Sequence, residues 1–357
     1  GGTTYRAAFN WRDIEGIGIN TGFSQINGRL NLSQKALNDR LTIGLNISST
    51  ERESDFGFSE AFRYATLYNP TAPVRWSDIQ GSAKYDADLD AKYGGYFQQE
   101  NFDYFNPVAI AEQGINQGTT KDLLINIKGD YELMDGLVAS ISYSRQKESD
   151  IYGQFYPSNA YFRGFNDKGL ATRSTNDNST ELFEMTGRYN VDFGNNSLSV
   201  LAGYSYQDFT FEGFNARATR FISNDLTFNN LNFGQLAAEG DPNAVSSYKS
   251  AYKVIGFFGR VNFDINDTYY LMASLRREGS SRFGVDNRWG WFPAVSAGVD
   301  LVKLADLSAD QMKLRLAYGV TGSLPPDSYL SQFLYTRQGN FYFNGGFVPA
   351  IGPARNS

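Results

Sequence analysis

Two groups of polar residues have the types and spacing needed to bind a ligand. The first group is Arg276, Arg277 and Arg282, which lie around Glu278 where a predicted strand ends. Guanidinium groups present several donors in a fixed plane, so this group could contact an anionic or hydroxylated ligand. The structural alternative is a network of salt bridges that fixes the following loop, and most charge clusters are of that kind.

The second group belongs to a long polar stretch earlier in the chain. Asn69, Asp103, Tyr104 and Asn106 could hydrogen-bond the hydroxyl groups of a sugar beside aromatic rings that stack on it. Asparagine and aspartate also stabilise turns and helix starts through the neighbouring backbone, so capping and turn formation are the alternative. We predict both groups as substrate-binding residues.

The composition excludes several kinds of chemistry. The 357 residues contain no histidine and no cysteine, so a Ser-His-Asp triad, a thiolate nucleophile and a histidine metal site are impossible. Asp86, Asp88 and Asp90 have the spacing of a calcium loop, but Ala91 and Phe97 stand where that loop needs glycine and glutamate. We therefore expect no catalytic residues, no cofactor and no metal. The net charge of -6 argues against nucleic acid as a partner.

The elements that must position these residues are predicted to be β-strands. From 182 to 206, apolar and polar side chains alternate around a turn at Gly194-Asn195-Asn196. Period-two alternation places one set of side chains on each face of a strand. The polar set is charged over much of its length, which is typical of a membrane barrel with lipid outside and water inside. The apolar set is Phe183, Met185, Tyr189, Val191, Phe193, Leu198, Val200, Ala202, Tyr204 and Tyr206.

The same pattern recurs along the chain and predicts about eleven strands. Short connections alternate with long ones, which indicates an antiparallel transmembrane β-barrel with long extracellular loops. A soluble β-sandwich would distribute its loop lengths more evenly. No stretch approaches the roughly 18 apolar residues of a transmembrane helix. The short turns lie near 35–40, 132–136, 194–197, 264–268 and 302–311, and the long loops cover 52–121, 148–180, 212–252 and 279–291.

Two short helices are predicted inside the longest loop. Residues 106–114 begin with asparagine and proline and end with glycine, which are the preferred residues at those helix positions. A second helix is expected from Ser59 to Leu67, ended by Asn69-Pro70. Loops of this length usually carry function, so we expect lids or binding surfaces.

Several segments resemble the SusC/RagA family of TonB-dependent outer-membrane transporters. The likeness runs over most of the chain, and the block 258–298 is its most specific part. The matching segments are RLNLSQK (29–35), YNPTAPV (68–74), DYFNPV (103–108), FGRVNF (258–263), LRREGSSRFG (275–284) and RWGWFPAVSAG (288–298).

This resemblance implies a barrel of about 22 strands in the outer membrane of a Gram-negative bacterium, of which this chain would supply about half. It also implies uptake of oligosaccharides or peptides through TonB, together with a SusD-like surface lipoprotein. We expect residues 1–357 to be part of the barrel domain, with the plug domain and the TonB box absent from this chain. A TonB-dependent siderophore receptor, and a passive porin or adhesin, are the alternatives.

Overall fold

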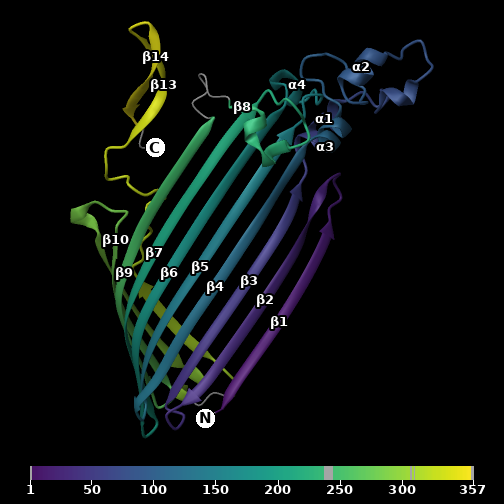
Figure 1. Cartoon of the computed structure of the whole chain (residues 1–357). Coiled ribbons are helices and arrows are strands. Elements are labelled where there is room, and N and C mark those ends of the chain that lie inside the picture. Colours follow the sequence, from purple (N-terminus) through teal and green to yellow (C-terminus); the bar gives the residue numbers. More distant parts are fainter. Residues whose placement is uncertain (1, 237–243, 306–307, 309, 355–357) are drawn as a thin grey trace.

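The computed structural model consists mainly of long antiparallel strands in one curved sheet (Figure 1). It describes residues 2–236, 244–305, 308 and 310–354. Eleven strands follow a single path, each hydrogen-bonded to the next, with β1 and β12 at the edges. This confirms the predicted fold class. The strands are β1 (Thr3–Glu15), β2 (Thr21–Ala36), β3 (Leu41–Phe56), β4 (Ile115–Met134), β5 (Leu137–Tyr156), β6 (Leu170–Phe193), β7 (Asn196–Thr219), β9 (Val245–Ile265), β10 (Tyr269–Ser280), β11 (Trp289–Asp300) and β12 (Lys313–Gly319).

Three further strands go beyond the sequence prediction. The two-residue strand β8 (Gln235–Leu236) pairs with β7. Strands β13 (Tyr335–Phe343) and β14 (Gly346–Pro353) form a separate antiparallel hairpin.

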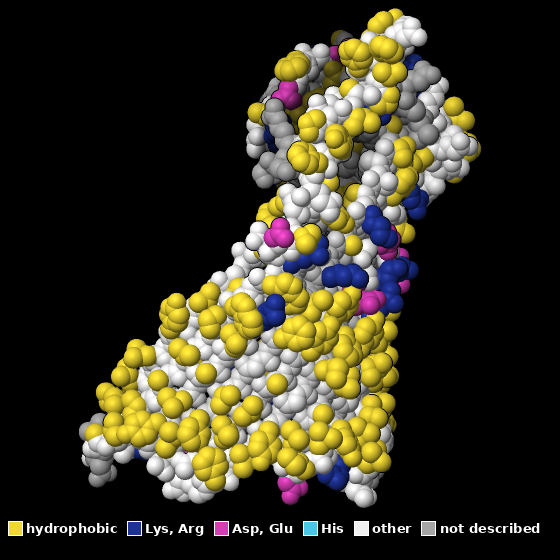
Figure 2. Space-filling view, turned by 90° about the vertical axis from the view of Figure 1, so that its left-hand side faces the viewer, with side chains coloured by type: hydrophobic (Ala, Val, Ile, Leu, Met, Phe, Trp, Pro, Cys, Tyr) yellow, Lys and Arg dark blue, Asp and Glu magenta, His cyan; other side chains and the backbone are white. Residues whose placement is uncertain are grey.

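The two faces of the large sheet differ in polarity. Met185 of β6 lies opposite Tyr204 of β7, which lies opposite Phe257 of β9, so the apolar rows continue across strands. We call this the outer face and the opposite one the inner face. Met185 and Phe257 are 45% and 50% exposed, so no second layer of the described residues covers them. Figure 2 shows the apolar band of the outer face beneath a zone of charged side chains.

The strands are much longer than the sequence pattern predicts, and the loops are correspondingly shorter. Strand β6 has 24 residues, whereas about 10 suffice to cross a bilayer. The expected loop 148–180 is wrong in its bounds, because β5 and β6 remain paired up to Tyr156 and Leu170. The loop therefore covers only 157–169. The error arises because backbone pairing continues where both faces of the sheet are polar and the alternation ends.

The short turns lie where the sequence predicts them, at the end of the sheet that we call the turn end. Gly136 shows why one of them needs glycine. Its φ is +78°, and a Cβ there would lie 2.2 Å from the Asn190 backbone oxygen. The predicted turn near 302–311 is described only in part, since 306–307 and 309 lie outside the described residues.

A short helix begins at Leu301, although the alternation of Val295, Ala297 and Val299 predicts that the strand continues to this residue. Helix α5 (Leu301–Ala305) begins directly after β11. Asp300 Oδ1 accepts hydrogen bonds from the backbone nitrogens of Val302 and Lys303, at 3.1 and 3.4 Å. Aspartate is a strong helix N-cap, which explains why the strand ends here.

The opposite end of the sheet, the loop end, carries a small folded unit made of residues 57–114 and 157–169 (Figure 1). We call it the loop unit. None of the described helices is long and apolar enough to cross a membrane. The helices of the loop unit are α1 (Glu60–Leu67), η1 (Trp76–Ile79), α2 (Ala87–Lys92), α3 (Pro107–Gln113) and α4 (Gly164–Asp167), and those of other connections are η2 (Thr227–Asn229), η3 (Leu231–Phe233) and η4 (Val285–Asn287).

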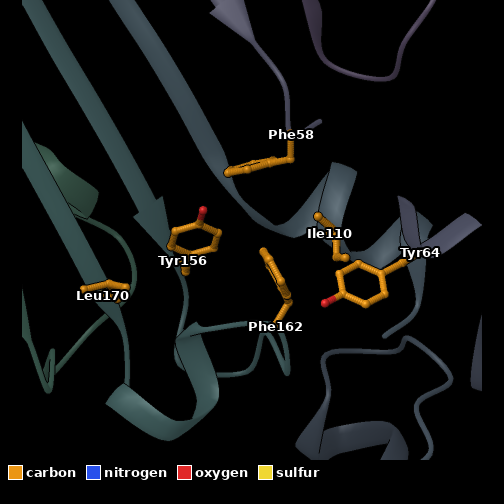
Figure 3. Packing of buried hydrophobic residues seen from close by; sticks show 6 residues of the cluster. All are labelled: Phe58, Tyr64, Ile110, Tyr156, Phe162 and Leu170. Atoms are coloured by element: carbon orange, nitrogen blue, oxygen red, sulfur yellow. The ribbon is translucent and has the colours of Figure 1, made fainter. Parts of the chain in front are cut away.

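Both predicted helices are confirmed as α1 and α3, and they pack on a core at the strand ends. Figure 3 shows Phe58 and Phe162 close to Tyr156, and Ile110 close to Tyr64. Tyr156 belongs to the end of β5, so this core joins the loop unit to the wall. The six buried residues of the core are Phe58, Tyr64, Ile110, Tyr156, Phe162 and Leu170.

Candidate functional site

The inner face of the sheet is a wall of hydrogen-bonded polar side chains. Asn126 donates from Nδ2 to the Ser144 hydroxyl at 2.6 Å, one strand away. The Thr120 hydroxyl donates to Asp150 at 2.6 Å in the same pair of strands. These bonds hold polar groups in place on a surface that remains open to water. Such a face can line an aqueous passage.

The structure divides the arginine group between the two faces. Arg276 lies on the inner face, where Nη2 is 2.5 Å from Glu278 Oε2. Its guanidinium also lies 5.6 Å from the centre of the Phe258 ring. Arg277 lies on the outer face, in register with Phe257 and Trp291. The separation follows from strand geometry, because consecutive residues point to opposite faces.

Arg282 joins a row of aromatic rings near the loop end. Its guanidinium lies 3.7 Å from the centre of the Tyr252 ring, and Nη1 donates to the Pro325 oxygen at 2.8 Å. Tyr252 stacks on Phe209 with 4.4 Å between ring centres and 11° between ring planes. Phe211 lies next, at 6.3 Å from Tyr252. We call Phe209, Phe211, Tyr252 and Arg282 the aromatic–arginine cluster.

This cluster belongs to the inner face and has the chemistry of a binding platform. Phe209 is in register with Tyr252, and it lies in step with the inner-face serines Ser199 and Ser205. Aromatic faces and a guanidinium can hold flat or hydroxylated groups by stacking, cation–π attraction and hydrogen bonds. All four side chains of the cluster are partly exposed.

Two of the predicted residues in the loop unit, Asp103 and Tyr104, form a polar and aromatic contact between its segments. Asp103 accepts hydrogen bonds from the Tyr64 hydroxyl at 2.6 Å and from Arg63 at 2.8 Å. The bond to Asp103 raises the pKa of Tyr64, so the phenol stays protonated and remains a donor. The ring of Tyr104 stacks on Tyr68 with 5.1 Å between centres.

Asn106 and Asn69 have their side chains engaged within the loop unit. Asn106 is 1% exposed, and its Oδ1 accepts from the backbone nitrogens of Val108 and Ala109 at the start of α3. Asn69 Oδ1 accepts from the backbone nitrogen and the hydroxyl of Thr71. The Asn69 backbone nitrogen donates to the Tyr104 hydroxyl at 3.1 Å. These contacts match the capping and turn alternative, and a role in substrate binding stays a prediction.

The aspartates with calcium-loop spacing lie at the start of helix α2, and the first of them caps it. Asp86 Oδ1 accepts from the backbone nitrogens of Asp88 and Leu89, both at 3.0 Å, and so caps α2. Within the part of the chain that the structure describes, no group of three or more acidic residues is arranged to hold a metal ion.

Of the aromatic–arginine cluster, only Arg282 is predicted from the sequence as a site residue. The expected loop 212–252 begins directly after Phe209 and Phe211 and ends at Tyr252. All three residues therefore lie outside the regular apolar alternation. The orientation of both phenylalanines could be predicted, because each is an even number of positions away from Ser199 and Ser205 on β7. Extending that phase past Tyr206 predicts that their rings point to the inner face.

The comparisons with known proteins point to one kind of protein. The TonB-dependent receptor P3 of Formosa agariphila is 31% identical over 251 residues, which are 68% of this chain and 24% of P3. The TonB-dependent receptor SusC of Bacteroides thetaiotaomicron is 26% identical over 340 residues, which are 89% of this chain and 32% of SusC. No family model matches the sequence.

Solved structures show the same fold. The RagAB peptide transporter superimposes on all of this chain with a TM-score of 0.75 and 21% identity, covering 39% of the RagAB chain. Of the curated relatives P3 and SusC, this chain spans about a quarter to a third of the length. The sequence likeness to SusC, the structural match to RagAB and the two-faced sheet all indicate the same family. The chain is therefore part of the β-barrel of a SusC/RagA-like TonB-dependent receptor.

Proposed function

We propose that this chain forms part of the wall of an outer-membrane importer that takes up oligosaccharides or peptides with energy supplied through TonB. The observation that carries this proposal is the division of one sheet into an exposed apolar outer face and a hydrogen-bonded polar inner face. The similar proteins are named TonB-dependent receptors, and RagAB is described as a peptide transporter.

The height of the apolar band supports a place in the bilayer. On β6 the outer-face residues run from Phe193 to Phe183, which is about 33 Å along a strand. At a tilt of about 40° this corresponds to about 25 Å across the membrane, the usual height of the apolar band of a barrel. Charged pairs follow on the outer face, with Arg145 Nε 3.5 Å from Glu181 Oε1. The turn end would face the periplasm and the loop end the exterior.

The inner-face residues near the loop end are the proposed substrate contacts. Arg282 and Tyr252 offer a charged donor and a ring, and Arg276 with Glu278 offers an ion pair on the same face. An incoming sugar or peptide would meet them after passing the loop unit. A SusD-like lipoprotein is the proposed partner on the exterior side, with the predicted residues Asn69, Asp103 and Tyr104 in the loop unit below it.

Uptake in cells with and without TonB tests the importer proposal. The protein that carries this chain would be expressed in a strain that lacks other routes for a labelled oligosaccharide or peptide. Uptake should stop when TonB is deleted. Uptake that persists without TonB would contradict the proposal and favour the passive porin, whereas binding of a ferric siderophore in place of both substrates would favour the siderophore receptor.

Two arginine variants test the substrate contacts. Arg282→Gln removes the guanidinium of the aromatic–arginine cluster, and Arg277→Gln is the matched control because its side chain lies on the outer face. A hydrogen bond from a charged group contributes about 1.5–3 kcal/mol, so Arg282→Gln should weaken substrate binding about 10- to 100-fold. Equal binding by both variants would remove Arg282 from the site.

A further inference from the structure

A row of small residues crosses the outer face of the sheet. Gly187 of β6 lies opposite Ala202 of β7, which lies opposite Gly259 of β9. A Cβ added at Gly187 would meet nothing within 4 Å, and one at Gly259 would meet only the Leu201 backbone oxygen at 3.6 Å. Both glycines lie in regularly paired strands without a register shift.

The described chain itself does not require glycine at these two positions. Glycine weakens a strand, and it usually marks a bulge, a sharp bend or the close approach of another molecule. Neither Gly187 nor Gly259 has a positive φ, and no protein atom crowds either of them. The space in front of both glycines is therefore open to a molecule that lies against the outer face.

The row opens into an apolar groove. Its floor is formed by Ala202 and Gly259, and its sides are formed by Phe257, Leu275 and Trp291. A second hollow, lined by residues such as Val261, Ala273 and Val295, continues it along the same strands towards the turn end. The groove therefore runs along the outer face in the direction in which a lipid chain enters the bilayer.

Arg277 stands at the loop end of this groove. Its guanidinium lies 4.9 Å from the centre of the Trp289 ring and 5.2 Å from that of Trp291. Tryptophan favours the level of the lipid headgroups, because its ring is apolar and its N–H is polar. Arg277 thus holds a positive charge at the headgroup level, above an apolar groove.

Among the described residues, no carboxylate pairs with Arg277, in contrast to Arg145 and Lys253 on the same face. Arg145 is paired with Glu181 at 3.5 Å, and Lys253 with Asp208 at 3.1 Å. Figure 2 shows the charged side chains gathered directly above the apolar band. The free guanidinium favours an anionic occupant.

We propose that this groove binds a phosphorylated lipid of the outer leaflet, with the phosphate on Arg277 and an acyl chain along Ala202 and Gly259. The depth agrees with one leaflet. From Arg277 to Leu271 is six residues on β10, about 20 Å along the strand and about 15 Å in depth at the same tilt of about 40°. The hydrocarbon core of a bilayer is about 30 Å thick, so one leaflet measures about 15 Å. This site goes beyond import, since it lies on the face opposite to the proposed passage.

Native mass spectrometry of the detergent-purified protein that carries this chain tests the lipid site. Diphosphoryl lipid A is the probe, inorganic phosphate tests the headgroup alone, and an uncharged diacylglycerol tests the chains alone. Arg277→Gln removes the charge, and Gly259→Leu fills the groove with a side chain suited to a lipid-facing position. Arg145→Gln is the matched control, because it removes an outer-face charge that already has a partner.

Arg277→Gln should lower lipid A binding about tenfold or more, which corresponds to the loss of one charge-assisted hydrogen bond. Gly259→Leu should lower it by a similar factor because its side chain occupies the groove, and Arg145→Gln should change it less than twofold. Slow migration of unheated protein on gels would show that a variant barrel had failed to fold, so only normally migrating variants are compared. The proposal is overturned if Gly259→Leu binds lipid A normally, if Arg145→Gln loses as much, or if phosphate or diacylglycerol alone binds equally well. A lipid-free dimer that Gly259→Leu disrupts would also overturn it, by showing that a second copy fills the groove.

Discussion

Replacing Asn106 by alanine tests whether this residue holds the loop unit together or binds ligand. The side chain is almost fully buried and makes four hydrogen bonds. Its Oδ1 accepts from the backbone nitrogens of Val108 at 3.0 Å and Ala109 at 3.3 Å. Its Nδ2 donates to the backbone oxygens of Val74 at 2.7 Å and Phe97 at 2.9 Å. One side chain thus links three segments of the loop unit.

The cost of the substitution can be worked from these contacts. Loss of an asparagine N-cap costs about 1 kcal/mol. Each donated hydrogen bond contributes about 1 kcal/mol net. The full penalty for an unpaired carbonyl does not apply, because the Val74 oxygen keeps the Phe97 backbone nitrogen and the Phe97 oxygen keeps the Tyr68 hydroxyl. The sum is about 3 kcal/mol, which corresponds to about a 100-fold rise in local opening.

Hydrogen exchange of the backbone amides measures this opening. In Asn106→Ala, exchange should accelerate about 100-fold in the loop unit and stay unchanged in β6 and β7, whose backbone pairs are separate. Asn106→Ser is the control, since its hydroxyl can keep the cap acceptor but is too short to replace both donated bonds, and its effect should be smaller. Unchanged exchange in Asn106→Ala together with lost substrate binding would refute the structural role and favour direct contact with ligand.

Two further predictions concern the wall and the pH response. Val200→Arg places a charge on the apolar face and should destabilise the barrel by about 2–4 kcal/mol in urea unfolding, whereas Ser199→Arg on the inner face should cost little. Equal effects would mean that the two faces are assigned wrongly. Lys92 lies 2.5 Å from Glu100, and its hydrogen bond, aided by Tyr93, holds the pKa of Glu100 below its usual range. Because the folded pKa is the lower one, this stabilisation is present above the usual glutamate pKa and is lost as the pH falls through the folded pKa. Hydrogen exchange near α2, corrected for the intrinsic rate, should therefore increase on acidification, and Glu100→Gln should abolish that pH dependence.

The positions of the strands could be predicted because each one carries its own signal. Leu198, Val200 and Tyr204 alternate with small polar residues, and the structure places them on β7 as the pattern requires. The helix starting at Asn106 was likewise predictable, since its cap, its proline and its closing glycine are all local. Local signals of this kind act within a few residues and need no knowledge of the fold.

The strand lengths could not be predicted from the same signal. Above the apolar band, Lys147 lies 3.7 Å from Asp177, so polar residues on neighbouring strands stabilise the extension of the sheet. Each of these polar residues, taken alone, is typical of a loop. The helix at Leu301 was missed for a related reason, because the cap at Asp300 competes with a strand pattern that continues through it.

The sequence by itself determined that this chain forms strands with one apolar and one polar side, because the alternation is a property of consecutive residues. The phase of that alternation also separates Arg276 from Arg277. Only the tertiary structure decided which residues from distant strands meet. Tyr252 reaches Phe209 across 43 positions, and Arg277 reaches Trp289 across a loop, through strand register. Register is fixed by backbone pairing between segments, and no single segment contains that information.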